Sequence, residues 1–261
     1  METVAREAAT VVLMRDRSPE HGEPEVLLMR RHAKANFGAG AYVFPGGMLE
    51  AADYSPAMLN LVRGMTVEEA ASEMQGVDPP EKALGLRVAA LRETFEEAGV
   101  LLARREDGSE FHPTQEQAAA LHHARTGADF AAVVQGLGLN LLVDQLVYIG
   151  HWITPVCRPI RFDTHFFLVS VTGRVEASPD RQEVMDEIWL TPSEALEQNK
   201  KGELRLMSPT MTNLEWLSVY GSTAETIEVL KEKPVQTILP KIIADSDGKE
   251  HIVHPWDKEY N

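Results

Sequence analysis

The segment from residue 79 to residue 98 constrains the fold most, because it has the pattern of a long helix with one apolar face. Residues three and four positions apart lie on the same side of a helix. Four apolar side chains follow this spacing and are predicted to be buried against a sheet: Leu84, Val88, Leu91 and Phe95. Asp78 is the predicted N-cap, Pro79 the first helical residue, and Gly99 lies beyond the C-terminal end.

Three carboxylates occupy the other face of this predicted helix. Glu93, Glu96 and Glu97 are spaced i, i+3 and i+4, so they project within about a third of the circumference. Each close pair costs on the order of 1 kcal/mol in repulsion unless a cation lies among them. Hard oxygen ligands suit Mg²⁺ or Mn²⁺, and no cysteine or histidine spacing suggests zinc. The alternative is an ordinary solvated helix face that happens to carry three glutamates.

Short apolar segments before and after this helix predict the strands of a sheet. The runs at 8–14 and 25–29 predict a hairpin, and further strands are expected at 41–44, 147–153, 164–171 and 184–190. The strand at 41–44 should stop at Pro45, Gly46 and Gly47, where the backbone can turn tightly and approach a ligand. Capping residues and spacing predict helices at 66–76, 114–125, 129–135, 192–198 and 210–220.

Composition limits the class of protein. The chain has 40 Asp and Glu against 25 Lys and Arg, a net charge of -15 that argues against nonspecific binding to nucleic acid or anionic lipid. Its 44% hydrophobic content is ample for a packed core, and Cys157, the single cysteine, excludes an internal disulfide. No apolar stretch of about 18 residues and no signal-peptide core occur. We therefore expect a cytoplasmic protein without nucleic-acid or membrane partners.

The residues around the acidic helix resemble the Nudix box, usually written GX5EX7REUXEEXGU with U an aliphatic residue. The second half is RETFEEAGV at 92–100, in which Thr94 stands at an aliphatic position. The first half departs more, because Asp53 replaces the usual glutamate and 38 residues separate it from Arg92 instead of seven. A box split in this way is similar to that of the coenzyme A diphosphatase branch, and the segments FPGGMLEAAD, WITPVCRPIRFDTHFFL and ADSDGKEHIVHPWDKEY also look related.

The resemblance implies a Nudix fold, an α+β architecture in which an α/β/α sandwich is built on a mixed sheet. One domain over residues 1–261 is expected, with helical insertions at about 54–78 and 112–143. These insertions could form a lid, a dimer contact or an acyl-chain pocket, so a homodimer is left open.

The resemblance also implies an activity. The expected reaction is hydrolysis of the pyrophosphate bond in coenzyme A or acyl-CoA, giving (acyl)phosphopantetheine and adenosine 3',5'-bisphosphate. The substrate could instead be ADP-ribose, NADH or another nucleoside diphosphate derivative, since the box reports pyrophosphate chemistry only. A Nudix-fold sensor that binds a nucleotide without cleaving it is an alternative of another class.

Carried over position by position, the pattern assigns metal binding to Glu93, Glu96 and Glu97, with a backbone carbonyl at Gly46 or Gly47. Glu93, Glu97, Arg92 and Glu183 are the predicted catalytic residues. Arg92 is expected to pair with a box carboxylate and hold its geometry, and Glu93 or Glu183 to remove the proton from the attacking water. The alternative for Glu183 is a solvated acid at a strand edge.

Basic and aromatic residues outside the box are expected to bind the substrate. Arg30, Arg31 and Arg161 could contact the extra 3'-phosphate of a coenzyme A nucleotide. Phe162 could stack on adenine, and Gly47 could let the backbone approach the ligand. For each basic residue the alternative is a charged strand end that aids solubility.

Overall fold

The computed structural model describes residues 3–17, 22–35, 37–111, 113–125, 129–172, 177–245, 247–248 and 250–260. Within these residues eight strands form one mixed sheet. Its strands are β1 (Arg6–Arg15), β2 (Glu25–Arg31), β3 (Tyr42–Val43), β4 (Gly46–Met48), β7 (Val147–Ile153), β8 (Phe162–Ser170), β9 (Val184–Leu190) and β10 (Thr237–Ile238). The order is β10-β7-β8-β1-β2-β3, with β4 paired to β1 and β9 paired to β2. The β1–β8 and β10–β7 pairs are parallel, and the other pairs are antiparallel.

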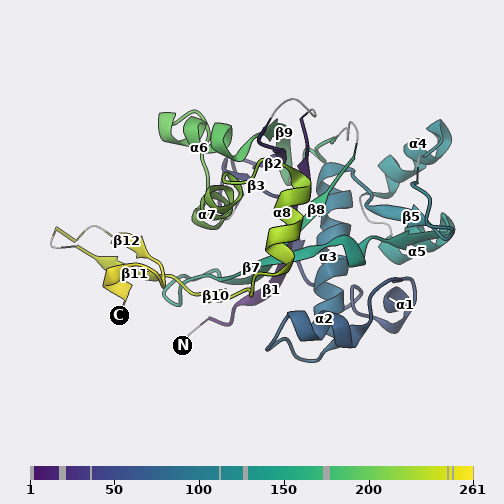
Figure 1. Ribbon diagram of the computed structural model, residues 1–261, viewed down its shortest axis with the longest axis horizontal. Coiled ribbons are helices and arrows are strands. Elements are labelled where there is room, and N and C mark those ends of the chain that lie inside the picture. The colour runs from purple at the N-terminus through teal and green to yellow at the C-terminus, as the bar shows by residue number, and fades with distance from the viewer. Residues whose placement is uncertain are drawn as a thin grey trace.

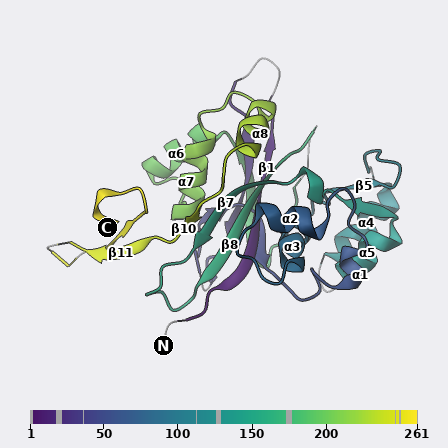
Figure 2. The same cartoon turned by 60° about the horizontal axis from the view of Figure 1, so that its bottom comes forward.

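Two hydrophobic cores lie on the two faces of the sheet, because successive side chains of a strand point to opposite faces. In β1, Val11 and Leu13 join the core beneath α3 (Glu81–Ala98), whereas Val12 and Met14 join the other core. That second core is covered by α6 (Pro192–Lys201), α7 (Ser208–Leu217) and α8 (Thr223–Lys231). Figure 2 shows the sheet between these two groups of helices, which is the predicted sandwich.

The helix α3 is buried on nearly every side, including its predicted apolar residues. Its C-terminal end is as predicted, with Gly99 in the left-handed conformation. Its start was predicted wrongly, because the helix begins at Glu81 with Pro80 as N-cap, and Asp78 is no cap. The cause is the pair of prolines: Pro79 precedes Pro80, and a residue before proline is disfavoured in the helical region.

The two segments predicted as helical insertions both contain helices. Residues 54–78 include α1 (Pro56–Leu59) and α2 (Val67–Glu73), and Thr66 and Glu69 form the predicted capping box at the start of α2. Residues 112–143 include α4 (Gln115–Ala124), α5 (Phe130–Gly136) and β6 (Leu139–Leu141), which pairs with β5 (Ala103–Arg105). These elements extend the α3 side of the molecule (Figure 1).

The C-terminal part of the chain adds elements that the sequence patterns did not predict. After α8 and β10, the strands β11 (Lys241–Ala244) and β12 (Glu250–Val253) pair antiparallel. This hairpin projects from the body beyond β7 and β10, on the side away from α1 to α5 (Figure 1). Within the described residues, none of the helices has the length and apolar character that crossing a membrane requires.

Candidate active site

Arg92 in the last turns of α3 is the centre of an ion-pair network. Its guanidinium donates from Nε to Asp53 Oδ1 at 2.8 Å and from Nη2 to Asp53 Oδ2 at 3.1 Å. Nη1 donates to Glu93 Oε1 at 2.8 Å and to Glu96 Oε2 at 2.9 Å, and Nη2 also donates to the Met48 carbonyl. Burial opposes the charge of Arg92, but the three carboxylates raise its pKa, so it stays a cation. Arg92 is therefore a positioning residue that fixes two glutamates and the β4 backbone.

The two glycines of β4 let the acidic end of α3 approach the sheet. The Gly46 N–H donates to Glu97 Oε2 at 3.0 Å. A Cβ atom at Gly47 would overlap the carboxylate of Glu93. Both positions therefore exclude a larger side chain for reasons of contact, and they place the β4 backbone against the carboxylates.

The three glutamates form a cluster of buried and half-buried carboxylates whose pKa values are raised. Burial raises the pKa of Glu97 to about 8 and that of Glu93 to about 7, and the neighbouring carboxylates, including Glu183, add to both shifts. Burial also raises the pKa of Glu96. Buried carboxyls that face one another without a full set of donors favour the protonated form unless a cation neutralises them. This donor set of oxygens fits Mg²⁺ or Mn²⁺.

Two departures from the usual box are accommodated locally. Thr94 is fully buried, and its hydroxyl donates to the Ala90 carbonyl at 2.8 Å, so no polar atom is left unpaired. Asp53 is also fully buried and accepts a further hydrogen bond from the Glu50 N–H at 2.8 Å. Although the insertion separates Asp53 from Arg92 in sequence, the two residues are in contact in the folded chain.

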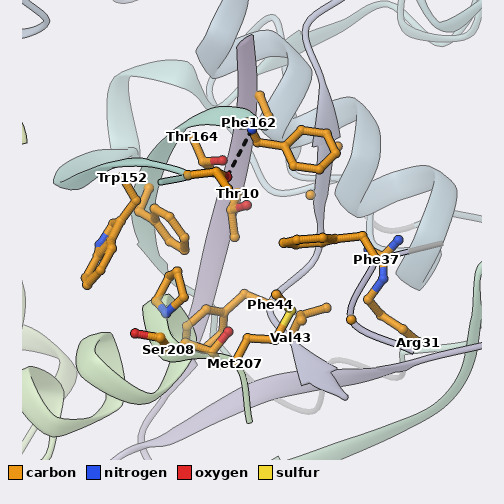
Figure 3. A pocket seen from close by; sticks show the side chains of 18 of the residues that line it. Thr10, Arg31, Phe37, Val43, Phe44, Trp152, Phe162, Thr164, Met207 and Ser208 are labelled. Atoms are coloured by element: carbon orange, nitrogen blue, oxygen red, sulfur yellow. Dashed lines mark hydrogen bonds between the residues drawn. The ribbon is translucent and has the colours of Figure 1, made fainter. Parts of the chain in front are cut away.

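Glu93 and Glu96 open into a cavity of about 750 Å³ on the α6–α7 side of the sheet, whereas Glu97 is buried and does not line it. The acidic end of the cavity includes Gly46, Gly47, Glu93, Glu96 and Glu183. Figure 3 shows Arg31 and Phe37 on one side of the cavity and Trp152 and Ser208 on the other, with Thr10 and Thr164 between them. No described residue of 54–78 or 112–143 lines it, so the helical insertions lie away from this cavity.

The substrate residues predicted from the sequence divide into two groups. Arg31, Gly47 and Phe162 line the cavity, but Arg30 and Arg161 do not. Arg30 points outward and pairs with Asp186 at 3.5 Å. Arg161 is buried and donates to the carbonyls of Thr154 and Thr3, so it anchors backbone instead of facing a ligand. The structure thus places Arg30 and Arg161 outside the cavity. Side chains alternate along an extended strand, so the pair Arg30–Arg31 alone could not show which arginine faces inward.

Other cavity residues were not found from the sequence. Phe37 packs edge-on against Phe162 at 5.4 Å, and the guanidinium of Arg6 lies 5.0 Å from the centre of the Phe162 ring. Trp152, which the sequence did not indicate as a substrate residue, lies on β7 opposite Thr164 of β8. These residues come from separate loops and strands, so only the folded chain brings them together.

A second cluster lies on the opposite face of β8 and was not predicted. His151, Asp163 and His165 have potential ligand atoms within 4.8 Å of one another. His151 Nε2 is hydrogen-bonded to Asp163 Oδ1 at 2.5 Å, and His165 Nδ1 to the Tyr148 hydroxyl at 2.9 Å. Burial lowers the pKa of His165 to about 3, so its ring is neutral at physiological pH. The cluster links β7 to β8 and is separate from the cavity.

Comparison with known proteins places these features in a family. A family model described as the NUDT19 Nudix domain matches residues 5–217. Acyl-coenzyme A diphosphatase NUDT19 of Gallus gallus is 30% identical over 98% of this chain and 79% of its own length. The Homo sapiens protein of the same name is 28% identical over 98% of this chain and 80% of its own length. A crystal structure of a Nudix hydrolase from Alicyclobacillus acidocaldarius matches 89% of this chain and 99% of that chain, with 30% identity and a TM-score of 0.72.

The class defined by the fold and the box is that of the Nudix hydrolases. The chain belongs to the NUDT19 Nudix domain family. It is a Nudix pyrophosphohydrolase, and the predicted α+β Nudix fold is confirmed. Nudix hydrolases act on nucleoside diphosphate derivatives and generally use a divalent metal ion.

Proposed function

We propose that this enzyme hydrolyses the pyrophosphate bond of coenzyme A and acyl-CoA, giving (acyl)phosphopantetheine and adenosine 3',5'-bisphosphate. The observation that carries the proposal is the meeting, in one cavity, of the box carboxylates with cationic and aromatic side chains suited to a nucleotide. The names of the vertebrate relatives support the choice of coenzyme A compounds over ADP-ribose or NADH.

The acidic end of α3 would bind Mg²⁺ or Mn²⁺ through Glu93, Glu96 and Glu97, with the carbonyl of Gly46 as a further ligand. When bound, the metal supplies charge neutralisation at the pyrophosphate and lowers the pKa of a coordinated water. The protein's own contribution is to hold the carboxylates in place through Arg92 and the Gly46 N–H. Gly47 leaves room for the Glu93 carboxylate against the β4 backbone.

Water adds to one phosphorus, the bridging P–O bond breaks, and the other phosphate departs with the bridging oxygen. The attacking water must lose a proton, and a carboxylate at the cavity can take it. Glu183 fits this role because it lines the cavity and is close enough to Glu93 and Glu97 for its charge to raise their pKa values. Glu93 is the other candidate, but its carboxylate already accepts a hydrogen bond from Arg92.

The nucleotide half of the substrate is assigned to the side of the cavity that holds Arg31, Phe37 and Phe162. The Phe37–Phe162 pair offers an apolar surface on which adenine can stack. Arg31 faces the cavity, and its Nε is buried without a hydrogen-bond partner within the described protein. A phosphate oxygen would satisfy that donor.

The proposal is tested by mass spectrometry of the products formed from coenzyme A, acyl-CoA, NADH and ADP-ribose with Mg²⁺ or Mn²⁺. Metal-dependent adenosine 3',5'-bisphosphate from the coenzyme A compounds is expected. Glu97→Gln should lower that rate by at least about 100-fold, because a predicted metal ligand loses its charge. The matched control is Glu228→Gln on α8, an exposed position outside the cavity, which should retain the wild-type rate.

Turnover confined to NADH or ADP-ribose would retain the Nudix chemistry and overturn the substrate assignment. Equal loss of activity in Glu97→Gln and Glu228→Gln would contradict the role given to the acidic end of α3. Product formation in the presence of a chelator at the full rate would contradict the metal requirement.

A further inference from the structure

The cavity has a second end that the chemistry of pyrophosphate cleavage does not use. The apolar residues of its wall there are Trp152 and three residues from the C-terminal part of the chain: Pro240, Ile242 and Ile252. These three lie beyond residue 217, where the match to the family model ends. Arg158, which pairs with Glu250 of the hairpin at 3.5 Å, also lines the cavity. The C-terminal hairpin therefore helps to shape the cavity.

The position of this wall follows from the order of the strands. A continuous row of paired residues crosses the sheet from Met48 on β4 through Ala8, Thr164 and Trp152 to Ile238 on β10. Neighbouring strands are about 4.8 Å apart, so Trp152 lies about 14 Å from the β4 strand and β10 about 19 Å from it. The hairpin β11–β12 follows β10 directly, at the far edge of this row.

The pantetheine arm of coenzyme A has a matching length. The arm has about twelve chain atoms from the phosphate ester to the sulfur. Four residues of polypeptide backbone have about the same number of atoms, so the extended arm spans about 14 Å. If the arm starts at the pyrophosphate beside β4 and crosses the sheet, its sulfur lies near Trp152. Thr10 and Thr164 line the cavity between its two ends (Figure 3), so their hydroxyls are available to hydrogen-bond the amides of an arm that takes this path.

An acyl group on that sulfur would continue past Trp152 onto the hairpin. Ile242 and Ile252 are cross-strand partners on one face of the hairpin, and both line the cavity. Ile252 is 44% exposed, so it presents apolar surface that an acyl chain could bury.

Aromatic contacts hold this wall in place at the base of the hairpin. The rings of His254 and Trp256 are stacked at 4.8 Å, and both make edge contacts with Trp152. Ser208 of α7 is hydrogen-bonded through its hydroxyl to His254 Nε2 at 3.1 Å. The wall is thus tied to both β7 and α7, and a ligand meets a preformed surface.

We propose that Trp152, Pro240, Ile242 and Ile252 form a binding site for the acyl group of an acyl-CoA. This site rests on the proposed hydrolysis of coenzyme A compounds and extends it to the choice among them. Medium-length and longer acyl chains are the ligands that the wall fits, because shorter groups end near Trp152.

The test compares kcat/KM for decanoyl-CoA with that for acetyl-CoA in the wild type and in the double variant Ile242→Thr, Ile252→Thr. Threonine is β-branched and keeps the preference for a strand, but it replaces apolar surface with a hydroxyl. We expect the decanoyl-to-acetyl ratio to fall by about tenfold, as expected for two lost methyl contacts with a buried chain.

The matched control is Ile243→Thr. Ile243 follows Ile242 directly on β11 and pairs with His251, so its side chain lies on the opposite face of the hairpin. It does not line the cavity. This variant should retain both rates and their ratio.

The possible results separate the two proposals. A wild-type ratio in the double variant, or an equal fall in Ile243→Thr, overturns the acyl site while hydrolysis of coenzyme A by the wild type still stands. If the wild type hydrolyses no coenzyme A compound, the proposed function fails and the acyl site fails with it.

Discussion

Arg92 and Asp53 form a fully buried, two-point ion pair across an insertion that divides the Nudix box, with N–O distances of 2.8 and 3.1 Å. The pair joins the two halves of the motif, because the same guanidinium also holds Glu93 and Glu96. The inserted residues can therefore vary without moving the carboxylates, provided that the contact between Asp53 and Arg92 is kept.

Replacing Asp53 should destabilise the protein strongly. Asp53→Asn removes the charge that balances Arg92 in the interior, and breaking a buried ion pair from one side costs about 3 to 5 kcal/mol. We expect the free energy of unfolding in urea to fall by about 3 kcal/mol, with a lower kcat because Glu93 and Glu96 lose their common anchor.

The exposed pair of Arg30 with Asp186 provides the control for that measurement. Asp186→Asn should change the free energy of unfolding by less than about 1 kcal/mol, since solvent screens a surface pair. Similar losses in the two variants would show that burial of the Asp53 pair is not what makes it important.

The stability of the metal-free protein should fall as the pH rises from 6.5 to 8. Burial raises the pKa of Glu93 to about 7 and that of Glu97 to about 8, so the folded protein retains protons that the unfolded chain has released. Stability then falls with pH, by about 1.4 kcal/mol per pH unit for each proton retained. His165, whose pKa burial lowers to about 3, acts in the opposite sense only below about pH 6.5.

Thermal unfolding followed across this pH window in a chelating buffer checks the sign. Glu97→Gln should flatten the slope, because the amide does not titrate and its oxygen can still accept from the Gly46 N–H. Mg²⁺ should also raise stability at pH 8. A metal-free stability that rises from pH 6.5 to 8 would contradict the assigned pKa values.

The sequence was sufficient to predict that the three glutamates of α3 lie close together, because they are near one another in the chain. Helical spacing alone places Glu93, Glu96 and Glu97 within one or two turns, and the glycines of the box follow a predicted strand. It was insufficient for residues whose role depends on contacts between distant segments. The sequence predicted that Arg92 pairs with a box carboxylate, but it did not indicate that Asp53, far away in the chain, is the buried partner. Trp152 likewise has no local pattern that points to a cavity.

The fold shows the same division. Strands and capped helices with clear periodicity were predicted, including the capping boxes at Thr66 and Thr114. The strand β4 was missed because a Gly-Gly-Met segment has low strand propensity, and it pairs with β1 only through long-range contacts. The strands β11 and β12 were missed as well, although one face of them lines the cavity.

Glu183 should affect catalysis without affecting stability. Its carboxylate lines the cavity and is exposed, so Glu183→Gln removes a proton acceptor while leaving the core intact. We expect kcat to fall by about 100-fold, within the usual range for a general base, with an unchanged melting temperature. Glu187→Gln on β9, the strand that begins directly after Glu183, lies outside the cavity and is the matched control. A normal kcat in Glu183→Gln would contradict this role and leave Glu93 as the candidate general base.

Arg31 and Arg30 are adjacent in sequence but face different surroundings, which makes them a matched pair for substrate binding. Arg31 lines the cavity near Glu97, whereas Arg30 points outward to Asp186. Arg31→Gln should raise KM for coenzyme A by about tenfold or more, since a charged hydrogen bond to a phosphate is lost. It should weaken inhibition by adenosine 3',5'-bisphosphate to a similar extent, and steady-state kinetics with and without this product measures both effects. Arg30→Gln should leave both values unchanged, and equal effects in the two variants would mean that the general positive charge of this strand end, and not a contact from Arg31, attracts the substrate.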